Sequence, residues 1–212
     1  EGMFAFCLYD RVKQQLICAR DRFGEKPFYF VLTETLFAFA SEPKSLYQHP
    51  AIRPQLGIDS AALLKYFVYG FVPAPDCLIQ PLRKLEAATV AEFYITTWQF
   101  SEQRYWDVAQ SVTPVSMTQA EALPRLDGLL SQAVERRLTA DVPVGIFLSG
   151  GLDSSVVAAY VAKAGRHFDA YTIAASDTAM DESTQAAAIA SHLRIPHHRV
   201  FLTQRDVLAT CS

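Results

Sequence analysis

The sequence has 212 residues, of which 50% are hydrophobic and 19% charged, so it can form a packed core and lies outside the disordered and fibrous classes. Its 19 basic and 22 acidic residues give a formal net charge of −3, which argues against nucleic acid or an anionic membrane as the main partner. The four cysteines form no C-x-x-C pair, and no apolar run has the length of a membrane span or the pattern of a signal peptide. We therefore expect a soluble, cytoplasmic protein.

The first fifty residues predict antiparallel strands. Short, aromatic-rich segments separated by polar turns lie at 3–9, 15–19, 28–32 and 36–40. The loop 21–27 between the second and third segments contains Gly24 and Pro27, which fix its backbone. A sheet with aromatic residues on one face needs a partner layer, and the rest of the sequence offers few strand candidates to supply it.

From residue 59 the apolar residues have helical spacing instead of the strand pattern of the first fifty residues. Residues 59–70 predict a short helix that Asp59 or Ser60 caps and Gly70 ends, and 89–96 predicts another strand. The polar stretch 110–117 has the composition of a linker. We therefore divide the chain into a first domain at 1–109, a linker at 110–117 and a second domain at 118–212.

The second domain predicts alternating α/β units. Thr118 and Glu121 have the spacing of a capping box at the start of a helix over 118–138, in which Leu126 and Leu129 belong to the apolar face. Strands at 144–148, 168–174 and 198–202 then alternate with helices at 154–164 and 182–193. This order predicts a parallel sheet with a ligand site at the carboxyl ends of its strands.

The loop after the first of these strands carries the clearest chemistry. It consists of Leu148, Ser149, Gly150, Gly151, Leu152, Asp153, Ser154 and Ser155. The glycines allow the backbone to approach a ligand, and the hydroxyls and free N–H groups at a helix start favour phosphate. Asp153 would repel a phosphate unless Mg²⁺ lay between them. The alternative is an ordinary tight turn in which Asp153 or Ser154 caps the helix.

The segment 149–155 resembles the pyrophosphate-binding loop, or PP-loop, of the ATP pyrophosphatases, which GMP and NAD synthetases also contain. Segments 2–6, 19–29 and 39–44 resemble the later part of the class II glutaminase domain of glutamine-hydrolysing asparagine synthetases. Segments 66–75, 105–107 and 138–144 are similar to the region that joins the two domains in that family. The resemblance implies an α+β part of an N-terminal-nucleophile glutaminase β-sandwich, followed by an α/β parallel sheet of the adenine-nucleotide α-hydrolase type.

For function, the resemblance implies a carbon–nitrogen ligase that makes asparagine from aspartate through β-aspartyl-AMP, with ATP, Mg²⁺ and glutamine as the ammonia source. The partners would be these small molecules, without nucleic acid or membrane, and a homodimer is compatible with the resemblance. Two alternatives stay open. One is a related amidotransferase that amidates a glycan, antibiotic or peptide carboxylate, and the other is a non-catalytic nucleotide-binding module.

The resemblance also assigns residues. It places the loop 148–155 on ATP, Asp153 near Mg²⁺, and Ile173 beside the adenine, with an ordinary core position as the alternative for Ile173. An acidic pair, Asp181 and Glu182, matches the family, although we favour a helix cap with favourable helix-dipole charge as its explanation. For the histidine pair 197–198 we expect a structural role at a strand start, because no third metal ligand is near in the sequence.

The glutaminase nucleophile of the family is a cysteine at the mature N-terminus, whereas residue 1 here is Glu and Cys7 lies within a predicted strand. We therefore expect an internal piece of the family's chain that contains no catalytic residue, has no glutaminase activity and binds Mg·ATP weakly at most. A family signature, formed by Arg20, Asp21, Gly24 and Lys26, is expected to shape its loop. Segment 85–88 departs from the family's Leu-Pro-Pro-Gly, and 174–175 departs from a glycine.

Overall fold

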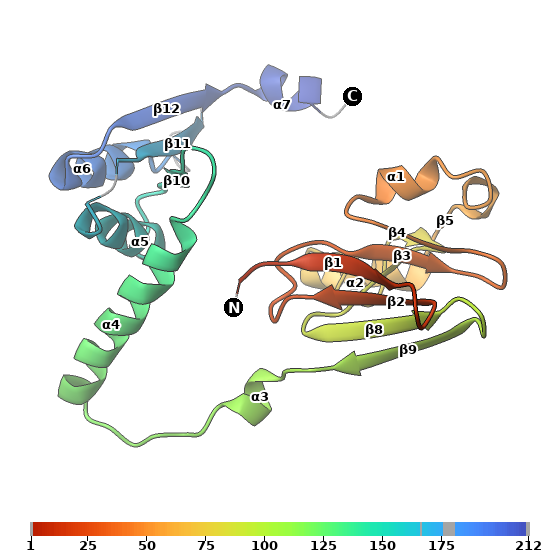
Figure 1. Ribbon diagram of the computed structural model, residues 1–212. Coiled ribbons are helices and arrows are strands. Elements are labelled where there is room, and N and C mark those ends of the chain that lie inside the picture. Colours follow the sequence, from red (N-terminus) through yellow and green to blue (C-terminus); the bar gives the residue numbers. More distant parts are fainter. Residues whose placement is uncertain (1, 166, 176–180, 211–212) are drawn as a thin grey trace. The chain divides into compact units, whose positions relative to one another are not determined.

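The computed structural model describes residues 2–165, 167–175 and 181–210 (Figure 1). The chain forms two compact units, 1–114 and 115–212, and each is described by itself. Within the described ranges, none of the helices combines the length and the apolar character that crossing a bilayer requires.

Two main antiparallel sheets and a two-stranded one, which pairs β5 (Gly57–Ile58) with β6 (Ile79–Gln80), form the first unit. Of the two main sheets, the larger has the order β1-β2-β8-β9, and the smaller has the order β4-β3-β7. The strands are β1 (Ala5–Asp10), β2 (Gln15–Arg20), β3 (Tyr29–Leu32), β4 (Phe37–Ala40), β7 (Arg83–Lys84), β8 (Thr89–Tyr94) and β9 (Gln99–Arg104). The first four strands therefore make two hairpins, β1–β2 and β3–β4, that belong to different sheets.

The core of this unit lies between the two sheets. Cys18 and Ala91 of the larger sheet pack with Phe30 of the smaller sheet, and all three are buried. Phe37 stacks on Phe93 with 4.6 Å between the ring centroids. The partner layer, for which the sequence offers few strand candidates, is present, because β3 and β4 join the short strand β7 in a second sheet. The polar strand β9 escaped prediction, since five of its six residues are exposed and no apolar alternation marks it.

Short elements connect the strands β4 and β7, and some of them pack on the outer face of the smaller sheet. They are α1 (Pro43–Tyr47), the 3₁₀ helix η1 (Arg53–Gln55), β5 (Gly57–Ile58), α2 (Ser60–Tyr69) and β6 (Ile79–Gln80). Buried Leu46 and Ile52 pack there with Val31 of β3. Helix α2 matches its prediction: the Asp59 carboxylate accepts the N–H groups of its first turn, and Gly70 ends it with a φ of +76°.

The chain then passes through a short helix, α3 (Val108–Ser111), into a parallel three-stranded sheet of order β10-β11-β12. The elements of the second unit are α4 (Gln119–Arg137), β10 (Gly145–Phe147), α5 (Leu152–Lys163), β11 (Asp169–Ala175), α6 (Ser183–Leu193), β12 (His197–Leu202) and α7 (Gln204–Thr210). The capping box at Thr118 and Glu121 is confirmed. Antiparallel sheets followed by a parallel α/β sheet agree with the predicted fold class.

Helices α5 and α6 cover the same face of the parallel sheet. Ala158 and Val161 of α5 share a buried cluster with Ala186 of α6 and Ala170 of β11. On the other face, Phe147 is 81% exposed. Helix α4 has the predicted bounds. Leu126 and Leu129 on its apolar face are more than half exposed, and the C-terminal part of the helix packs on the core through Val134 and Leu138.

Candidate functional site

The candidate site lies where β10 ends and α5 begins. Leu148 is 1% exposed, and its N–H donates to the carbonyl of Tyr171 over 2.9 Å. Its carbonyl accepts the hydroxyl proton of Thr172, a buried residue of β11. The first residue of the loop is therefore fixed to the neighbouring strand through both of its backbone polar groups.

The Thr172 hydroxyl also contacts His197 of β12, with 2.7 Å between Oγ1 and Nε2. Because the hydroxyl gives its one proton to Leu148, His197 Nε2 acts as the donor. Burial lowers the pKa of His197, and the nearby charges of Arg199 and His198 lower it further, so the neutral ring is favoured. Hydrogen bonds from β12 to β11 and on to Leu148 thus support the loop. No sequence signal marked the role of Thr172.

Serine hydroxyls hold the loop in shape. Ser149 Oγ and Ser154 Oγ lie 3.0 Å apart, and the Gly151 N–H donates to Ser149 Oγ over 3.3 Å. The Ser155 hydroxyl donates to the Gly151 carbonyl over 2.6 Å. The sequence predicts that these hydroxyls face a ligand, and the structure adds an internal role in which they hold the backbone between strand and helix.

The two glycines of the loop have different roles. Gly150 has a φ of +84°, and a Cβ atom there would lie 2.8 Å from Gln185 Cβ and 3.0 Å from the backbone nitrogen of Ala186. A side chain at Gly150 would therefore collide with α6. Gly151 has no positive φ, and its nearest neighbour would be Ser149 Oγ at 3.4 Å. Close packing against α6 explains why residue 150 is glycine. At the exposed Gly151, the missing side chain leaves the backbone accessible to a ligand.

Helix α5 begins without a side-chain cap. Its N-cap residue is Gly151, and within the described part of the chain no side chain accepts a hydrogen bond from its first turn. The cap that the alternative assigns to Asp153 or Ser154 is therefore wrong, because the N-cap residue is Gly151, whereas a loop that serves only as a turn stays an alternative. Asp153 is exposed, and its carboxylate has no hydrogen bond or ion pair among the described residues. Uncapped N–H groups and a free carboxylate thus stand beside the glycines.

A cavity of about 270 Å³ adjoins this loop at the carboxyl ends of β10 and β11. Its lining includes Leu148, Ser149, Ile173 and Glu182. A second, apolar recess of about 450 Å³ continues from Ile173 and Phe147 over the uncovered face of the sheet. Ile173 is 59% exposed, so it is not a core residue of this unit. The first two residues of the predicted loop, Leu148 and Ser149, therefore line one cavity together with Ile173.

The remaining polar residues predicted near the site have partners of their own. The Asp181 carboxylate accepts both the N–H and the hydroxyl of Ser183, the first residue of α6, at 3.0 Å. Asp181 thus has the role of a cap at this helix start, while Glu182, the N-cap residue, makes no side-chain cap bond. His198 Nε2 lies 3.0 Å from Asp169 Oδ2, and its ring stacks on Tyr171. Both histidines therefore attach the start of β12 to β11. Among the described residues, no three acidic, histidine or cysteine side chains are grouped as a metal site.

The loop 21–27 of the first unit is closed by its own contacts. The Arg20 guanidinium donates to the carbonyls of Gly24, Lys26 and Leu85 at 2.6–2.8 Å. The Asp21 carboxylate is 1% exposed and accepts four backbone N–H groups, from Phe4, Phe23, Glu25 and Lys26. Burial raises the pKa of Asp21, but the four N–H donors outweigh it and hold that pKa below its ordinary value. The predicted structural role of this signature is confirmed.

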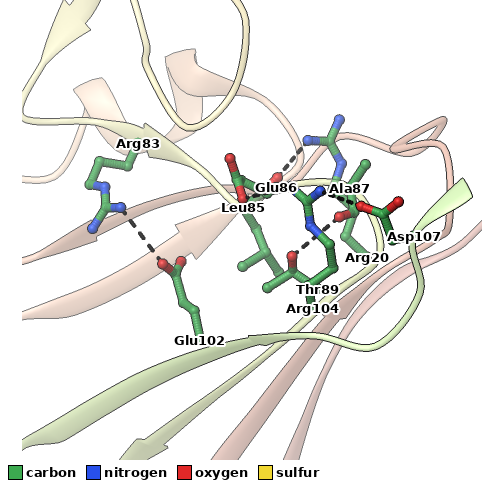
Figure 2. Close-up of polar contacts among 9 residues, drawn as sticks. All are labelled: Arg20, Arg83, Leu85, Glu86, Ala87, Thr89, Glu102, Arg104 and Asp107. Atoms are coloured by element: carbon green, nitrogen blue, oxygen red, sulfur yellow. Dashed lines mark hydrogen bonds and ion pairs between the residues drawn. The ribbon is translucent and has the colours of Figure 1, made fainter. Parts of the chain in front are cut away.

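Segment 85–88 runs beside this loop (Figure 2). Arg104 pairs with Glu86 and Asp107 at 3.2 Å each, and Arg20 reaches the Leu85 carbonyl. Ala88, which stands where the resemblance expects glycine, has a φ of +55° and is buried. The backbone thus keeps the left-handed conformation that glycine would adopt without strain.

Two family descriptions match successive parts of the chain. Residues 1–106 match "Glutamine amidotransferase domain", and residues 125–212 match "Asparagine synthase". The matched regions contain the closed loop 21–27 and the open loop 148–155, respectively.

Curated relatives match nearly the whole chain. A putative asparagine synthetase 2 of Methanocaldococcus jannaschii is 32% identical over 97% of this chain, and asparagine synthetase 3 of Bacillus subtilis is 31% identical over 98%. Amidase chyE of Penicillium rubens is 31% identical over 76%. The chain spans 40%, 35% and 23% of the lengths of these three relatives. With both domains matched in order, the chain belongs to the glutamine-hydrolysing asparagine synthetase family.

Proposed function

We propose that this chain is part of a ligase that makes asparagine from aspartate, ATP and glutamine, with β-aspartyl-AMP as the intermediate. The observation that carries the proposal is the uncapped start of α5, which closely follows Leu148 and Ser149 in the lining of a cavity at the carboxyl ends of parallel strands. Asp153 in the first turn of this helix is exposed and has no partner among the described residues. A helix start of this kind binds anions, because its N–H groups lack partners and its dipole favours negative charge.

In this proposal the first turn of α5 binds the β- and γ-phosphates of ATP. Gly150 and Gly151 bring the backbone close to them, and the network of Ser149, Ser154 and Ser155 keeps the N–H groups in place. These groups are ordered before a ligand binds, so they can stabilise the pyrophosphate as its charge develops.

The donor set fits Mg²⁺. This ion is commonly held by one or two carboxylates together with phosphate oxygens and water, and Asp153 is an exposed carboxylate beside the proposed phosphate position. Bound there, Mg²⁺ would neutralise charge on the departing pyrophosphate. The role of Asp153 is to hold the ion at the loop.

The adenine is proposed to lie at the end of β11. There the backbone of Ile173 would pair with the edge of the base, and the exposed Ile173 side chain would pack on its face. The apolar recess that continues from Ile173 over the sheet supplies a surface of the right character.

The first unit is proposed to belong to the glutaminase that supplies ammonia. We assign no catalytic residue within it: Cys7 lies in the middle of β1 with its sulfur against Cys18, and it has no free α-amino group to act as a base. Free thiols at Cys7, Cys18 and Cys77 suit the reducing cytoplasm that we propose as the location.

Calorimetric titration with Mg·ATP tests the nucleotide site. Asp153→Asn should weaken binding by about tenfold or more, since it removes the charge that holds the ion. The matched control is Asp141→Asn, another exposed aspartate of the second unit, which should bind like the wild type. Equal affinity in all three proteins would reject the site and favour a loop that serves only as a turn.

A related amidotransferase with another acceptor is the second candidate, because a relative named as an amidase is 31% identical to this chain. ATP–pyrophosphate exchange by the full-length protein distinguishes the two. Exchange that depends on aspartate would support asparagine synthesis, and exchange that depends only on a different carboxylate would replace it.

A further inference from the structure

Two cysteines face each other across the first hairpin. Cys7 of β1 and Cys18 of β2 are direct partners in the antiparallel register, and their Sγ atoms are 3.5 Å apart. Directly opposed residues of antiparallel strands have Cα atoms about 4.5–5.5 Å apart, which falls within the range that a disulfide spans. The backbone therefore already has the spacing that a covalent link requires.

The two thiols differ in exposure. Cys18 is 1% exposed and belongs to the core between the sheets, whereas Cys7 is only partly buried on β1, the edge strand of its sheet. A small oxidant can therefore reach Cys7 before Cys18, whose sulfur lies next to the Cys7 sulfur. This is the arrangement of an attacking thiol with a resolving thiol.

The hydrogen bond between the thiols supports the same order. The Cys18 S–H donates to the Cys7 sulfur, which lowers the pKa of Cys7. The same bond raises the pKa of Cys18, and burial raises it further. The thiolate is the reactive form, so Cys7 is the one prepared to attack.

We propose that Cys7 and Cys18 are a site of reversible oxidation by hydroperoxides, which closes the β1–β2 hairpin with a disulfide. The Cys7 thiolate attacks the peroxide, gains an oxygen as a sulfenic acid and releases hydroxide. The Cys18 sulfur then attacks the Cys7 sulfur, and the sulfenic oxygen leaves as water with the Cys18 proton. One peroxide is reduced and two thiols are oxidised. This site is independent of the proposed ligase activity.

Peptide mass spectrometry of the folded, peroxide-treated 212-residue chain tests the proposal. Trypsin cuts after Arg11, Lys13 and Arg20, so Cys7 and Cys18 fall on separate peptides that only a disulfide can join. The expected product is the joined pair, two mass units lighter than the free peptides and separated again by dithiothreitol. Cys77 is the internal control: it is buried in the other core and should stay reduced under the same treatment.

Two variants check the order of steps. In Cys18→Ser, Cys7 should form a sulfenic acid that dimedone traps, and in Cys7→Ser, Cys18 should remain a thiol. In the oxidised wild type, amide exchange across β1 should slow by at least about tenfold, because the link holds the edge strand to β2. Circular dichroism confirms that each variant is folded. Unlinked Cys7 and Cys18 in the folded, peroxide-treated wild type, or oxidation of Cys77 before this pair is linked, would overturn the proposal.

Discussion

The loops 21–27 and 148–155 contain similar residues, but the carboxylate of the first accepts hydrogen bonds within its own loop, whereas the second leaves its carboxylate and the first N–H groups of α5 without side-chain partners among the described residues. Each follows a strand, and each contains a glycine with a positive φ and an aspartate. In the first loop Asp21 is buried and binds four N–H groups of the same unit. In the second, Asp153 is exposed and helix α5 starts without a cap.

The difference separates a structural loop from a binding loop. A carboxylate whose acceptor sites are occupied by backbone has little left for a ligand, whereas uncapped N–H groups beside a free carboxylate are incomplete until something binds. Residue composition does not reveal this, because Gly and Asp serve both purposes. Substitutions in both loops test this contrast.

Asp21→Ala should unfold or severely destabilise the first unit, by about 3–5 kcal/mol, because it leaves four buried N–H groups without an acceptor. Urea unfolding followed by tryptophan fluorescence measures this, since both tryptophans, Trp98 and Trp106, lie in the first unit. The counterpart Asp153→Ala should change the stability of the second unit by less than about 0.5 kcal/mol. Similar losses for both aspartates would remove the distinction between the loops.

Gly150→Ala should cost the second unit about 1–3 kcal/mol, because the new Cβ meets α6 and the residue must keep a positive φ. Gly151→Ala is the matched control, with ordinary contacts and no positive φ. Hydrogen exchange of peptides from α5 and α6 measures the two variants. Faster exchange in Gly151→Ala than in Gly150→Ala would contradict the packing argument.

Thr172→Val should cost about 1–3 kcal/mol, because the Leu148 carbonyl and His197 Nε2 lose their shared partner in a buried position. Thr172→Ser keeps the hydroxyl and should recover most of the loss. Exchange of the β10 and β11 amides is the readout. If serine and valine behave alike, the methyl group and not the hydroxyl supports the loop.

The pH dependence of the first unit should carry the signature of Asp21. Its pKa is lowered on folding, so its stabilisation is full above the ordinary aspartate pKa of about 3.9 and disappears as the pH falls through the lower, folded value. Asp21→Asn lacks this titration. Acid titration followed by tryptophan fluorescence should show a smaller loss of stability below pH 4 in the variant, and equal losses would assign the acid transition to other carboxylates.

Ala88→Gly should stabilise the first unit by about 1 kcal/mol or less, because glycine adopts the φ of +55° without strain, while the lost methyl burial offsets part of the gain. Urea unfolding again measures it, with Ala87→Gly as the control. Destabilisation by Ala88→Gly would show that packing of the methyl group outweighs the backbone strain.

The sequence predicted the elements that local signals mark. Hydrophobic period, caps and glycines located the β1–β2 hairpin, α2, the capping box of α4 and the open loop. It could not show that β3 and β4 belong to a second sheet, since that depends on pairing with β7, about fifty residues away. Thr172 was missed because threonine is ordinary in strands, and only the fold brings its hydroxyl to Leu148 and His197.

The pairing of β2 with β8 has a consequence for synthesis. Gln15 of β2 pairs with Tyr94, so the central ladder of the larger sheet joins segments that leave the ribosome far apart in time. At about 5–20 residues per second, several seconds separate the first hairpin from its partner strand. During that interval β8 is absent, and the backbone N–H and C=O groups on the free side of β2 can pair with a wrong strand. The first unit therefore matures late, when β9 has been made, although its first strands are among the first residues of this chain.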